Sequence, residues 1–211
     1  MSYHGYTPLV KRFLYSLPHT PTVLEVGIDR GVTLIPLTAF LAATKKEFVV
    51  IGIDVMVQEP LQLTMQGLGL QEQQRLFLIQ GNSLEVLPQL VKQQIKFDVL
   101  LLDGDHNYHT VSRELEHLED LTYPHSIVII DDYEGRWADR DLWYAQRPEY
   151  EKNEFVTQPV ESEKHGVKPA VDEFLAAHPE WKTARPIPGE PIVLTRAILD
   201  PESEKNHDES Q

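Results

Sequence analysis

The sequence contains no cysteine among its 211 residues. Disulfide bonds, thiolate metal sites and cysteine nucleophiles are therefore excluded together, although this absence does not decide the cellular compartment. Basic residues are also scarce, because 19 lysines and arginines face 33 aspartates and glutamates, which gives a formal net charge of −14. Nonspecific binding to nucleic acid or to an anionic membrane needs clustered cations, so we expect neither partner.

Long apolar runs are missing as well. No stretch approaches the roughly 20 apolar residues that a membrane-spanning helix needs, and residues 1–15 lack the apolar core of a signal peptide. We therefore expect no membrane association and a cytoplasmic location. Hydrophobic residues still make up 41% of the chain, which is enough to bury a core.

Short apolar segments alternate with helical patterns from residue 22 onward. Five of these segments have the apolar, β-branched composition of buried strands. The expected strands are Thr22–Val26, Phe48–Ile53, Leu76–Ile79, Phe97–Leu102 and Ser126–Ile130. The expected helices cover residues 6–17, 32–44, 61–70, 83–91 and 108–121. Apolar strands joined by helices are typical of a parallel sheet buried on both faces, here a Rossmann-like, doubly wound α/β fold.

The alternation stops after residue 132. Residues 133–165 are rich in charged and aromatic residues and proline, which is typical of a lid or binding loop inserted into a domain. A helix at 167–177 and two closing strands complete a mostly parallel sheet of seven strands. The closing strands are expected at 181–184 and 192–194, joined by a turn at Pro188 and Gly189. We expect one domain over residues 1–198 and a disordered acidic tail over 199–211.

Two glycines, Gly27 and Gly31, follow the first expected strand, and Glu25 lies inside its end. Glycine allows a sharp turn and the close approach of a ligand. The start of the next helix offers free N–H groups to an anion. The spacing differs from the dinucleotide pattern G-x-G-x-x-G, and by itself it is equally compatible with a simple tight turn.

Polar residues also end the second and third expected strands. Asp54 could accept hydrogen bonds from both ribose hydroxyls of a nucleoside or could cap the next segment. Together with the glycine turn, it favours a nucleoside cofactor at the carboxyl edge of the sheet. After the third strand, Ser83 is expected to cap the following helix. For Asn82, capping and contact with an adenine edge remain open.

Acidic residues gather at the ends of the fourth and fifth expected strands. Asp103 and Asp105 follow the fourth strand, and Asp131 and Asp132 follow the fifth. If the strands are neighbours, their ends lie about 5 Å apart. Such carboxylates repel one another unless a cation lies between them, and oxygen ligands suit a hard divalent ion, above all Mg²⁺, with Ca²⁺ or Mn²⁺ as alternatives. We expect Asp103, Asp131 and Asp132 to be the ligands.

One histidine accompanies this acidic group. His106 follows Asp103 by three residues and could accept a proton from a substrate hydroxyl, because the ordinary pKa of histidine lies near working pH. The other histidines show no comparable partners in the sequence pattern, so we expect them to be surface or packing residues. They are His4, His19, His109, His117, His125, His165, His178 and His207.

These motifs together resemble a known enzyme family. E-V-G-x-x-x-G, the acid that closes the second strand, G-N-S, L-D-G-D-H-x-Y and I-I-D-D-Y are similar to motifs of class I S-adenosylmethionine-dependent methyltransferases. The similarity is greatest to the small group with a D-G-D-H motif and to metal-dependent O-methyltransferases of natural-product sugars. It extends over residues 22–133.

The resemblance implies S-adenosylmethionine as the cofactor and Mg²⁺ as the metal. It implies that the cofactor is bound by Glu25, Gly27, Gly31, Asp54, Asn82, Ser83 and Asp103. The implied metal ligands are Asp103, Asp131 and Asp132, and His106 matches the base of some family members. Other members lack this histidine and use a ligand aspartate, so Asp103 is a second candidate for the catalytic role.

The preferred hypothesis is an O-methyltransferase that acts on a hydroxyl of a small molecule, such as a sugar or a glycosylated natural product. Residues 133–165 would form the acceptor pocket or its lid, although their aromatic residues could equally pack a small core of their own. A metal-dependent hydroxylase or hydrolase and a non-catalytic nucleoside-binding module are the alternatives. The N-terminal helix and residues 133–165 could also mediate homo-oligomer formation.

Overall fold

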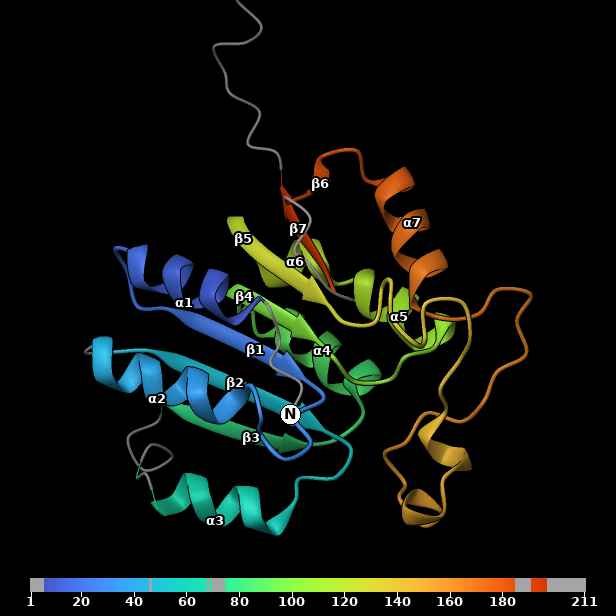
Figure 1. The fold of residues 1–211 in the computed structure, drawn as a ribbon, viewed down its shortest axis with the longest axis horizontal. Helices are drawn as coiled ribbons and strands as arrows, with labels where there is room; N and C mark the ends of the chain where they lie inside the picture. Colours follow the sequence, from blue (N-terminus) through green and yellow to red (C-terminus); the bar gives the residue numbers. More distant parts are fainter. Residues whose placement is uncertain (1–5, 46, 68, 70–74, 185–190, 197–211) are drawn as a thin grey trace, which may run out of the picture.

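The computed structural model describes residues 6–45, 47–67, 69, 75–184 and 191–196. One sheet contains the strands β1 (Thr22–Val26), β2 (Val49–Asp54), β3 (Leu76–Gln80), β4 (Phe97–Leu102), β5 (Thr122–Ile130), β6 (Trp181–Thr183) and β7 (Ile192–Arg196). Their order across the sheet is β3-β2-β1-β4-β5-β7-β6 (Figure 1). The pairs from β3 to β5 are parallel, and the pairs β5–β7 and β6–β7 are antiparallel.

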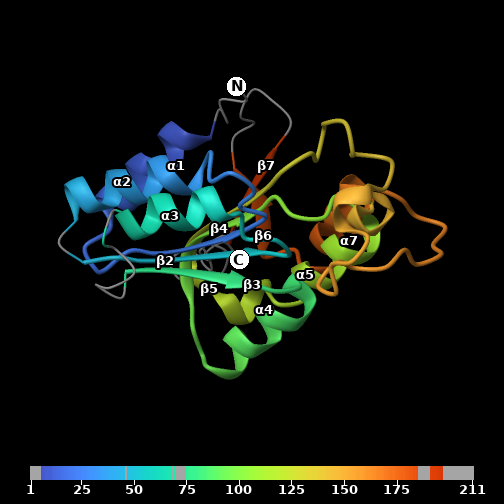
Figure 2. The ribbon, with the colours of Figure 1, turned by 90° about the horizontal axis from the view of Figure 1, so that it is seen from below.

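Helices cover both faces of this sheet. They are α1 (Thr7–Ser16), α2 (Leu34–Thr44), α3 (Glu59–Gly67), α4 (Ser83–Lys92), α5 (Tyr108–Leu115), α6 (Leu118–Leu121) and α7 (Val167–Ala177). Figure 2 shows α1, α2 and α3 on one face and α4 and α5 on the other. Helix α7 packs against α5. The predicted doubly wound, mostly parallel seven-stranded sheet is confirmed.

The central strand β4 explains why apolar residues run without interruption in the sequence. Val99 and Leu101 belong to the hydrophobic cluster beneath α1, α2 and α3. Leu100 and Leu102 belong to the cluster on the face of α4 and α5. Successive side chains of a strand point to opposite faces, so a strand covered on both sides is apolar at every position.

The structure moves two of the expected boundaries in the central part of the chain. Strand β5 begins at Thr122 rather than at residue 126, and its register against β4 shifts between Phe97 and Val99. The expected helix over 108–121 is divided into α5 and α6. The division coincides with a tighter turn, in which the His117 N–H donates to the Glu114 carbonyl at 3.2 Å.

Other boundaries differ by a few residues. Helix α2 begins at Leu34 rather than at 32, and α3 covers Glu59–Gly67 rather than 61–70. The expected turn at Pro188 and Gly189 and the expected tail at 199–211 lie outside the described residues. None of the helices in the described ranges combines the length and apolar character that a membrane crossing requires.

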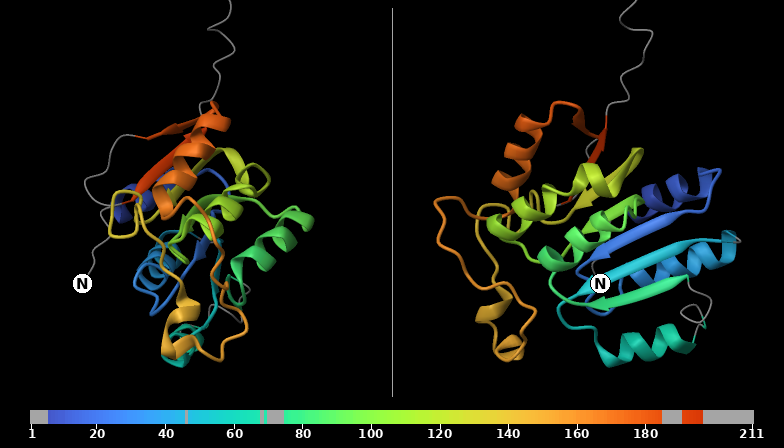
Figure 3. Two further views of the ribbon diagram at one scale, coloured as in Figure 1. Left: turned by 90° about the vertical axis from the view of Figure 1, so that its right-hand side faces the viewer. Right: turned by 180° about the vertical axis from the view of Figure 1, so that it is seen from behind.

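Parallel strands place the segments that follow them at one edge of the sheet. The turns after β1, β2, β3, β4 and β5 therefore meet beyond the carboxyl ends of these strands. The segment 133–165 lies off the same edge, as the two views of Figure 3 show. It contains two short 3₁₀ helices, Tyr144–Gln146 and Pro148–Tyr150. This edge carries the candidate functional residues.

Candidate active site

The glycine turn after β1 lies directly against the end of β4. Gly27 has a φ of +83°, and a Cβ atom built on it would lie 2.0 Å from the carbonyl oxygen of Asp103. Its N–H donates to the carbonyl of Ile53 at 2.8 Å. Only glycine fits this backbone position, because a side chain would occupy the space of the neighbouring main chain.

Gly31 has a different part in the same turn. Its φ is +75°, and a Cβ atom there would lie 2.6 Å from Cδ1 of Leu61 and 3.0 Å from the side chain of Ile35. Gly31 is also absent from the residues that line the adjacent cavity. The structure therefore gives Gly31 a role in turn geometry and packing, and its predicted contact with the cofactor remains untested.

Asp54 ties the glycine turn to the end of β2. Its Oδ2 accepts the N–H groups of Ile28 and Asp29, each at 2.9 Å, and its Oδ1 accepts the N–H of Met56 at 2.9 Å. Burial raises the pKa of Asp54, although these three backbone hydrogen bonds act in the opposite direction. The carboxylate lines the cavity while it organises the turn around it.

Glu25 is close to Asp54 but does not line the cavity. Its side chain is buried, and its Oε2 has no hydrogen-bond partner in the structure. Burial, with the Asp54 carboxylate as a second cause, raises the pKa of Glu25 to about 8. Glu25 is also absent from the cavity lining, so the structure provides an unpartnered acid beside the turn but no direct exposure to the cavity.

A cavity of about 430 Å³ opens at this edge of the sheet. Ligand sites in proteins typically measure a few hundred to about 1,000 Å³, so the space suits a nucleoside-sized molecule. Among the predicted cofactor residues, the cavity is lined by Gly27, Asp54, Asn82, Ser83 and Asp103. Five more lining residues come from the 133–165 segment, namely Tyr144, Arg147, Glu149, Tyr150 and Thr157.

Asn82 rather than Ser83 caps helix α4, so the capping prediction for Ser83 is wrong. The Oδ1 of Asn82 accepts the N–H of Leu84 at 2.9 Å. Its Nδ2 donates to Oγ1 of Thr157 at 3.2 Å. Asn82 has the extended backbone of an N-cap, whereas Ser83 is already the first residue of the helix. The Asn82 side chain therefore joins α4 to the 133–165 segment at the cavity wall.

The 133–165 segment is held to the site by specific hydrogen bonds. Leu142 N–H donates to the carbonyl of His106 at 3.0 Å, and Asn153 Nδ2 donates to the carbonyl of Val55 at 2.9 Å. Tyr144 and Tyr150 contact one another edge to face, with ring centroids 5.0 Å apart, and both line the cavity. The segment therefore forms one wall of the cavity.

Not every aromatic residue of this segment faces the cavity. Trp137 lies between two arginines, with the guanidinium carbons of Arg136 and Arg140 at 4.7 and 5.2 Å from its ring centroid. Trp143 is buried and is absent from the cavity lining, as is Trp137. Tyr144 thus faces the cavity while the tryptophans pack elsewhere, and the expectation that the segment forms the acceptor pocket or its lid stays a prediction.

The ends of β4 and β5 bring three ionisable side chains together. Asp103, His106 and Asp131 each offer one ligand atom within 4.8 Å of the others. The Nε2 of His106 lies 3.6 Å from Oδ1 of Asp103, and its Nδ1 lies 3.6 Å from Oδ2 of Asp132. Asp132 lies outside this group of three and faces the opposite nitrogen of the imidazole. The sequence thus predicted that Asp103, His106, Asp131 and Asp132 lie close together, but not that Asp103, His106 and Asp131 form the closest group.

The electrostatics of the cluster follow from burial and like charge. Burial, followed by the charges of Asp131 and Glu25, raises the pKa of Asp103 well above its ordinary value. Burial lowers the pKa of His106, although Asp132 and Asp131 act in the opposite direction. The imidazole is therefore neutral near pH 7 and can accept a proton. Asp105, beside the cluster, has its pKa raised by burial to about 6, although hydrogen bonds that include one from Thr110 oppose the shift.

Tyr6 belongs to this environment, although its sequence pattern indicated only a helix that covers the sheet. Its side chain is 2% exposed, and Thr33 forms a hydrogen bond with it. Burial raises the pKa of the Tyr6 phenol, and the charges of Asp103 and Glu25 act in the same direction. Tyr6 lies nearly 100 residues before Asp103 in the chain, so no local pattern could have connected them.

Behind the cavity, Glu114 is a second buried acid. It is 1% exposed, and its Oε1 has no hydrogen-bond partner. Burial raises its pKa to about 8, although a hydrogen bond from Ser83 opposes the shift. Glu114 belongs to α5, and Ser83 belongs to α4. The hydrogen bond between them therefore depends on how these two helices pack against each other.

Replacing Glu114 by glutamine is expected to remove a pH-dependent loss of stability. Between about pH 4.5 and 8, the unfolded chain releases the Glu114 proton while the folded chain keeps it, so the wild-type free energy of unfolding falls as the pH rises. The variant should gain a few kcal/mol relative to wild type from pH 5 to pH 8 and no more above pH 8. Urea denaturation at pH 5, 6.5, 8 and 9 measures this. Glu116→Gln, at the C-cap of the same helix, is the exposed control, and an equal pH dependence in both variants would contradict the expectation.

Four of the histidines that we expected to be surface or packing residues are partly exposed, but they also have acidic partners. Three of these contacts join residues 24 or more positions apart in the chain, which explains why the sequence pattern did not reveal them, whereas His178 and Glu180 are two residues apart. The contacts are His19–Asp98 and His125–Asp98 at 2.7 Å, His165–Asp141 at 2.7 Å and His178–Glu180 at 3.3 Å. His4 and His207 lie outside the described residues.

Comparisons with known proteins agree with this arrangement. A family described as "Methyltransferase domain" matches residues 24–133. No curated protein matches the sequence. Among solved structures, the chain is similar to CalS11, a TDP-rhamnose 3′-O-methyltransferase of calicheamicin biosynthesis, with a TM-score of 0.61 and 16% identity over 90% of this chain and 76% of that chain.

A second solved structure is MycE, a methyltransferase of the mycinamycin pathway in complex with Mg, SAH and mycinamycin VI. The TM-score is 0.55 and the identity 15%, over 93% of this chain and 50% of that chain, so the present chain spans half the length of MycE. At these identities the two structures show a shared fold. The family match covers more than half of the present chain, which therefore belongs to the methyltransferase domain family and is a class I S-adenosylmethionine-dependent methyltransferase.

Proposed function

We propose that this methyltransferase transfers the methyl group to a hydroxyl oxygen of a small molecule, such as a sugar or a glycosylated natural product, with the help of Mg²⁺ or another hard divalent cation. The observation that carries the proposal is the group formed by Asp103, His106 and Asp131 within 4.8 Å. Asp103 also lines the cavity, so the group borders the space proposed for the cofactor.

Several features of the cavity suit S-adenosylmethionine. The missing side chain at Gly27 leaves the main chain of the turn free to lie against a ligand. Asp54, Asn82 and Ser83 supply polar groups along the wall, and Tyr150 supplies an aromatic face. When bound, the cofactor supplies an electrophilic methyl group on a sulfonium centre. Glu25 and Gly31 support the turn from behind, and their direct contact with the cofactor stays a prediction.

The acidic group suits a divalent cation. Crowding of Asp103 against Asp131 and burial raise the pKa of Asp103, and a cation between the carboxylates would relieve both penalties. Asp103 and Asp131 are the proposed ligands, with Asp132 as the third predicted one. A cation held there supplies Lewis acidity that makes a nearby hydroxyl easier to deprotonate.

The proposed base is His106. Its lowered pKa leaves the imidazole neutral near pH 7, and it lies at the inner end of the acidic group. The carboxylate of Asp132, 3.6 Å from Nδ1, can hold the ring in one tautomer and stabilise it after it accepts the proton. Asp103 remains the alternative base, because a raised pKa makes its ionised carboxylate a stronger proton acceptor than an ordinary aspartate.

The solved structures add support for the oxygen acceptor. CalS11 is a TDP-rhamnose 3′-O-methyltransferase, and the MycE structure contains Mg, SAH and mycinamycin VI. The present chain carries acidic residues at two neighbouring strand ends, as a cation site needs. The acceptor class is therefore proposed by analogy with these proteins, whereas the acidic group is a feature of this chain itself.

A turnover assay with labelled S-adenosylmethionine tests the function. Nucleotide sugars, glycosylated macrolides and catechols are supplied as acceptors, with Mg²⁺ or with EDTA, and S-adenosylhomocysteine is quantified. Turnover on an acceptor with neighbouring oxygens that disappears with EDTA supports the proposal. Turnover unaffected by EDTA would remove the metal from it. Tight binding of S-adenosylhomocysteine without turnover on any acceptor would favour the non-catalytic nucleoside-binding alternative.

Removal of the aromatic ring of Tyr150 is expected to weaken cofactor binding. Tyr150 faces the cavity from the 133–165 segment, and an aromatic contact is worth about 0.5–1.5 kcal/mol, or about two- to tenfold in affinity. Calorimetric titration of Tyr150→Ala with S-adenosylhomocysteine measures the change. Tyr15→Ala, at a tyrosine that is 64% exposed and outside the cavity lining, is the matched control. Equal affinities in the two variants would show that the segment does not contact the cofactor.

A further inference from the structure

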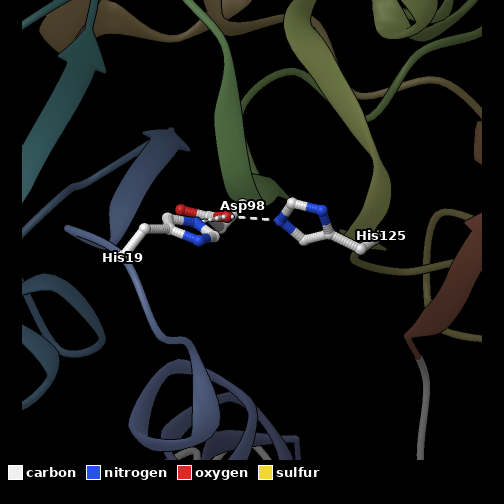
Figure 4. A group of neighbouring side chains, drawn as sticks. All are labelled: His19, Asp98 and His125. Carbon is white, nitrogen blue, oxygen red and sulfur yellow. Dashed lines mark hydrogen bonds and ion pairs between the residues drawn. The ribbon is translucent and has the colours of Figure 1, made fainter.

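Two histidines and a buried aspartate meet at the edge of the sheet opposite the candidate active site. His19 lies in the connection between α1 and β1, Asp98 is the second residue of β4, and His125 lies in the first half of β5. Figure 4 shows both imidazole rings close to the carboxylate of Asp98, and the two ring centroids lie 5.3 Å apart. Strand β4 separates Asp98 from Asp103 by about 16 Å, so the two clusters are independent.

The contacts in this cluster are short and converge on one oxygen. The Nε2 atoms of His19 and His125 each lie 2.7 Å from Oδ1 of Asp98. The other oxygen, Oδ2, accepts the N–H of Thr22 at 2.8 Å and its hydroxyl at 3.0 Å. Thr22 therefore fixes the plane of the carboxylate and leaves Oδ1 to face the two imidazoles.

The carboxylate of Asp98 is buried and pairs with the two imidazoles. The side chain of Asp98 is fully buried, and its ion-pair partners in the described ranges are the two histidines, with no lysine or arginine among them. Within the described ranges, the carboxylate of Asp98 therefore has no permanently charged cationic partner.

The histidines remain accessible to ions from solvent. Their side chains are 43% and 39% exposed, for His19 and His125 respectively. Tyr123 stacks on the ring of His125 with an interplanar angle of 3°, which restrains the orientation of that ring. The cluster thus combines an entry path with donors that are held in place, which are two requirements of a metal site.

We propose that His19, Asp98 and His125 form a second metal site, which binds a divalent transition-metal ion, with Zn²⁺ as the ion that fits best. One ligand atom from each residue lies within 4.8 Å of the others. Two imidazole nitrogens and one carboxylate oxygen form a ligand set typical of Zn²⁺ and related ions, whereas Mg²⁺ prefers oxygen ligands alone. Water would complete the tetrahedron on the exposed side.

Small movements of the rings would accommodate the ion. Ligands of a tetrahedral Zn²⁺ at about 2.0 Å lie about 3.3 Å from one another. Each imidazole would therefore withdraw from Asp98 by about 0.6 Å, which the exposed rings of His19 and His125 can do. An ion bound there connects the segment before β1 to β4 and β5, so it stabilises the amino edge of the sheet.

The test uses protein without a histidine tag, freed of metal by chelation and then titrated with Zn²⁺ by calorimetry. The titration is performed in the Asp103→Asn background with excess Mg²⁺, so that the acidic group of the active site does not contribute. We expect one Zn²⁺ per chain and, at a hundredfold excess over the Kd, a rise in the melting temperature of about 5–10 °C. Substitution with Co²⁺ should give the visible absorption of a tetrahedral site.

The decisive variant is the double substitution His19→Gln and His125→Gln. Glutamine can still donate a hydrogen bond to Asp98 but is a poor ligand for Zn²⁺, so the fold should persist while Zn²⁺ affinity falls at least about 100-fold. His178→Gln, in the other group of His178, Glu119 and Glu180, is the matched control and should leave the binding unchanged. No Zn²⁺ binding by the parent, or equal binding by the double variant, would overturn the proposal and leave a hydrogen-bonded cluster.

Discussion

Asparagine in place of Asp103 is expected to lower the rate of methyl transfer by about 1,000-fold or more. Asp103 lies at the meeting point of the cavity, the acidic group and His106, so its carboxylate is shared by every part of the proposed chemistry. Removal of the charge weakens the binding of the divalent cation and removes one of the two candidate bases. Metal-ion catalysis and general base catalysis each contribute about 100-fold or more in comparable enzymes.

The same substitution should not harm the fold. The raised pKa of Asp103 means that the ionised carboxylate destabilises the folded state near neutral pH, because it is buried and repelled by Asp131. Asparagine removes this penalty at nearly the same volume, so the melting temperature should stay equal or rise. Loss of turnover together with retained stability separates a chemical role from a structural one.

Three measurements examine the Asp103 variant. S-adenosylhomocysteine production gives the rate, Mn²⁺ titration gives the cation affinity, and thermal denaturation gives the stability. Asp139→Asn, at an exposed aspartate of the 133–165 segment, is the matched control and should behave as wild type. His106→Ala should retain Mn²⁺ binding better than Asp103→Asn while it loses the base. Wild-type turnover in Asp103→Asn would remove Asp103 from both the metal site and the mechanism.

Alanine at Gly27 is expected to destabilise the protein by about 3 kcal/mol or more. The φ of +83° is strained for any residue with a Cβ, and that atom would lie 2.0 Å from the Asp103 carbonyl oxygen and 2.4 Å from its carbon. These are backbone atoms, which cannot relieve the clash by a change of rotamer as a flexible side chain can. The turn after β1 and the end of β4 would therefore move apart, which deforms the cavity at the same time.

Urea denaturation and calorimetric titration with S-adenosylhomocysteine check this expectation. Gly67→Ala is the matched control, because Gly67 ends α3 and a Cβ there meets no atom within 4 Å. The control should change the free energy of unfolding by no more than about 1 kcal/mol, in either direction. If Gly27→Ala keeps both the stability and the cofactor affinity of wild type, the close approach of the two loops is not required.

The strands were predictable because a strand that is buried on both faces is apolar at almost every position. In β4, each position from Phe97 to Leu102 is buried, and only Asp98 is polar. The ends of strands were less certain, as β5 shows, because Thr122–His125 lacks the continuous apolar character of Ser126–Ile130. Its pairing depends on hydrogen bonds with β4 that the local sequence does not encode.

The acidic group was predictable for a topological reason. Asp103 and Asp131 end successive strands of a parallel sheet, and the parallel arrangement brings such ends to one edge. The capping of α4 was not predicted correctly, since Asn82 and Ser83 are both good caps and only the backbone geometry distinguishes them. Tyr6, Tyr150 and Thr157 could not be assigned to the site at all.

The sequence by itself determined the buried parallel strands, the glycine turn at Gly27 and the acids that follow β4 and β5. Each of these features depends on residues that are close together in the chain. The tertiary structure decided that Tyr150 lines the cavity and that His19 and His125 share Asp98. The two histidine contacts join residues 79 and 27 positions apart in the chain, and Tyr150 belongs to a loop that lies over distant strand ends. Local patterns report the burial of a residue, whereas its partner depends on how the whole sheet and its connections pack.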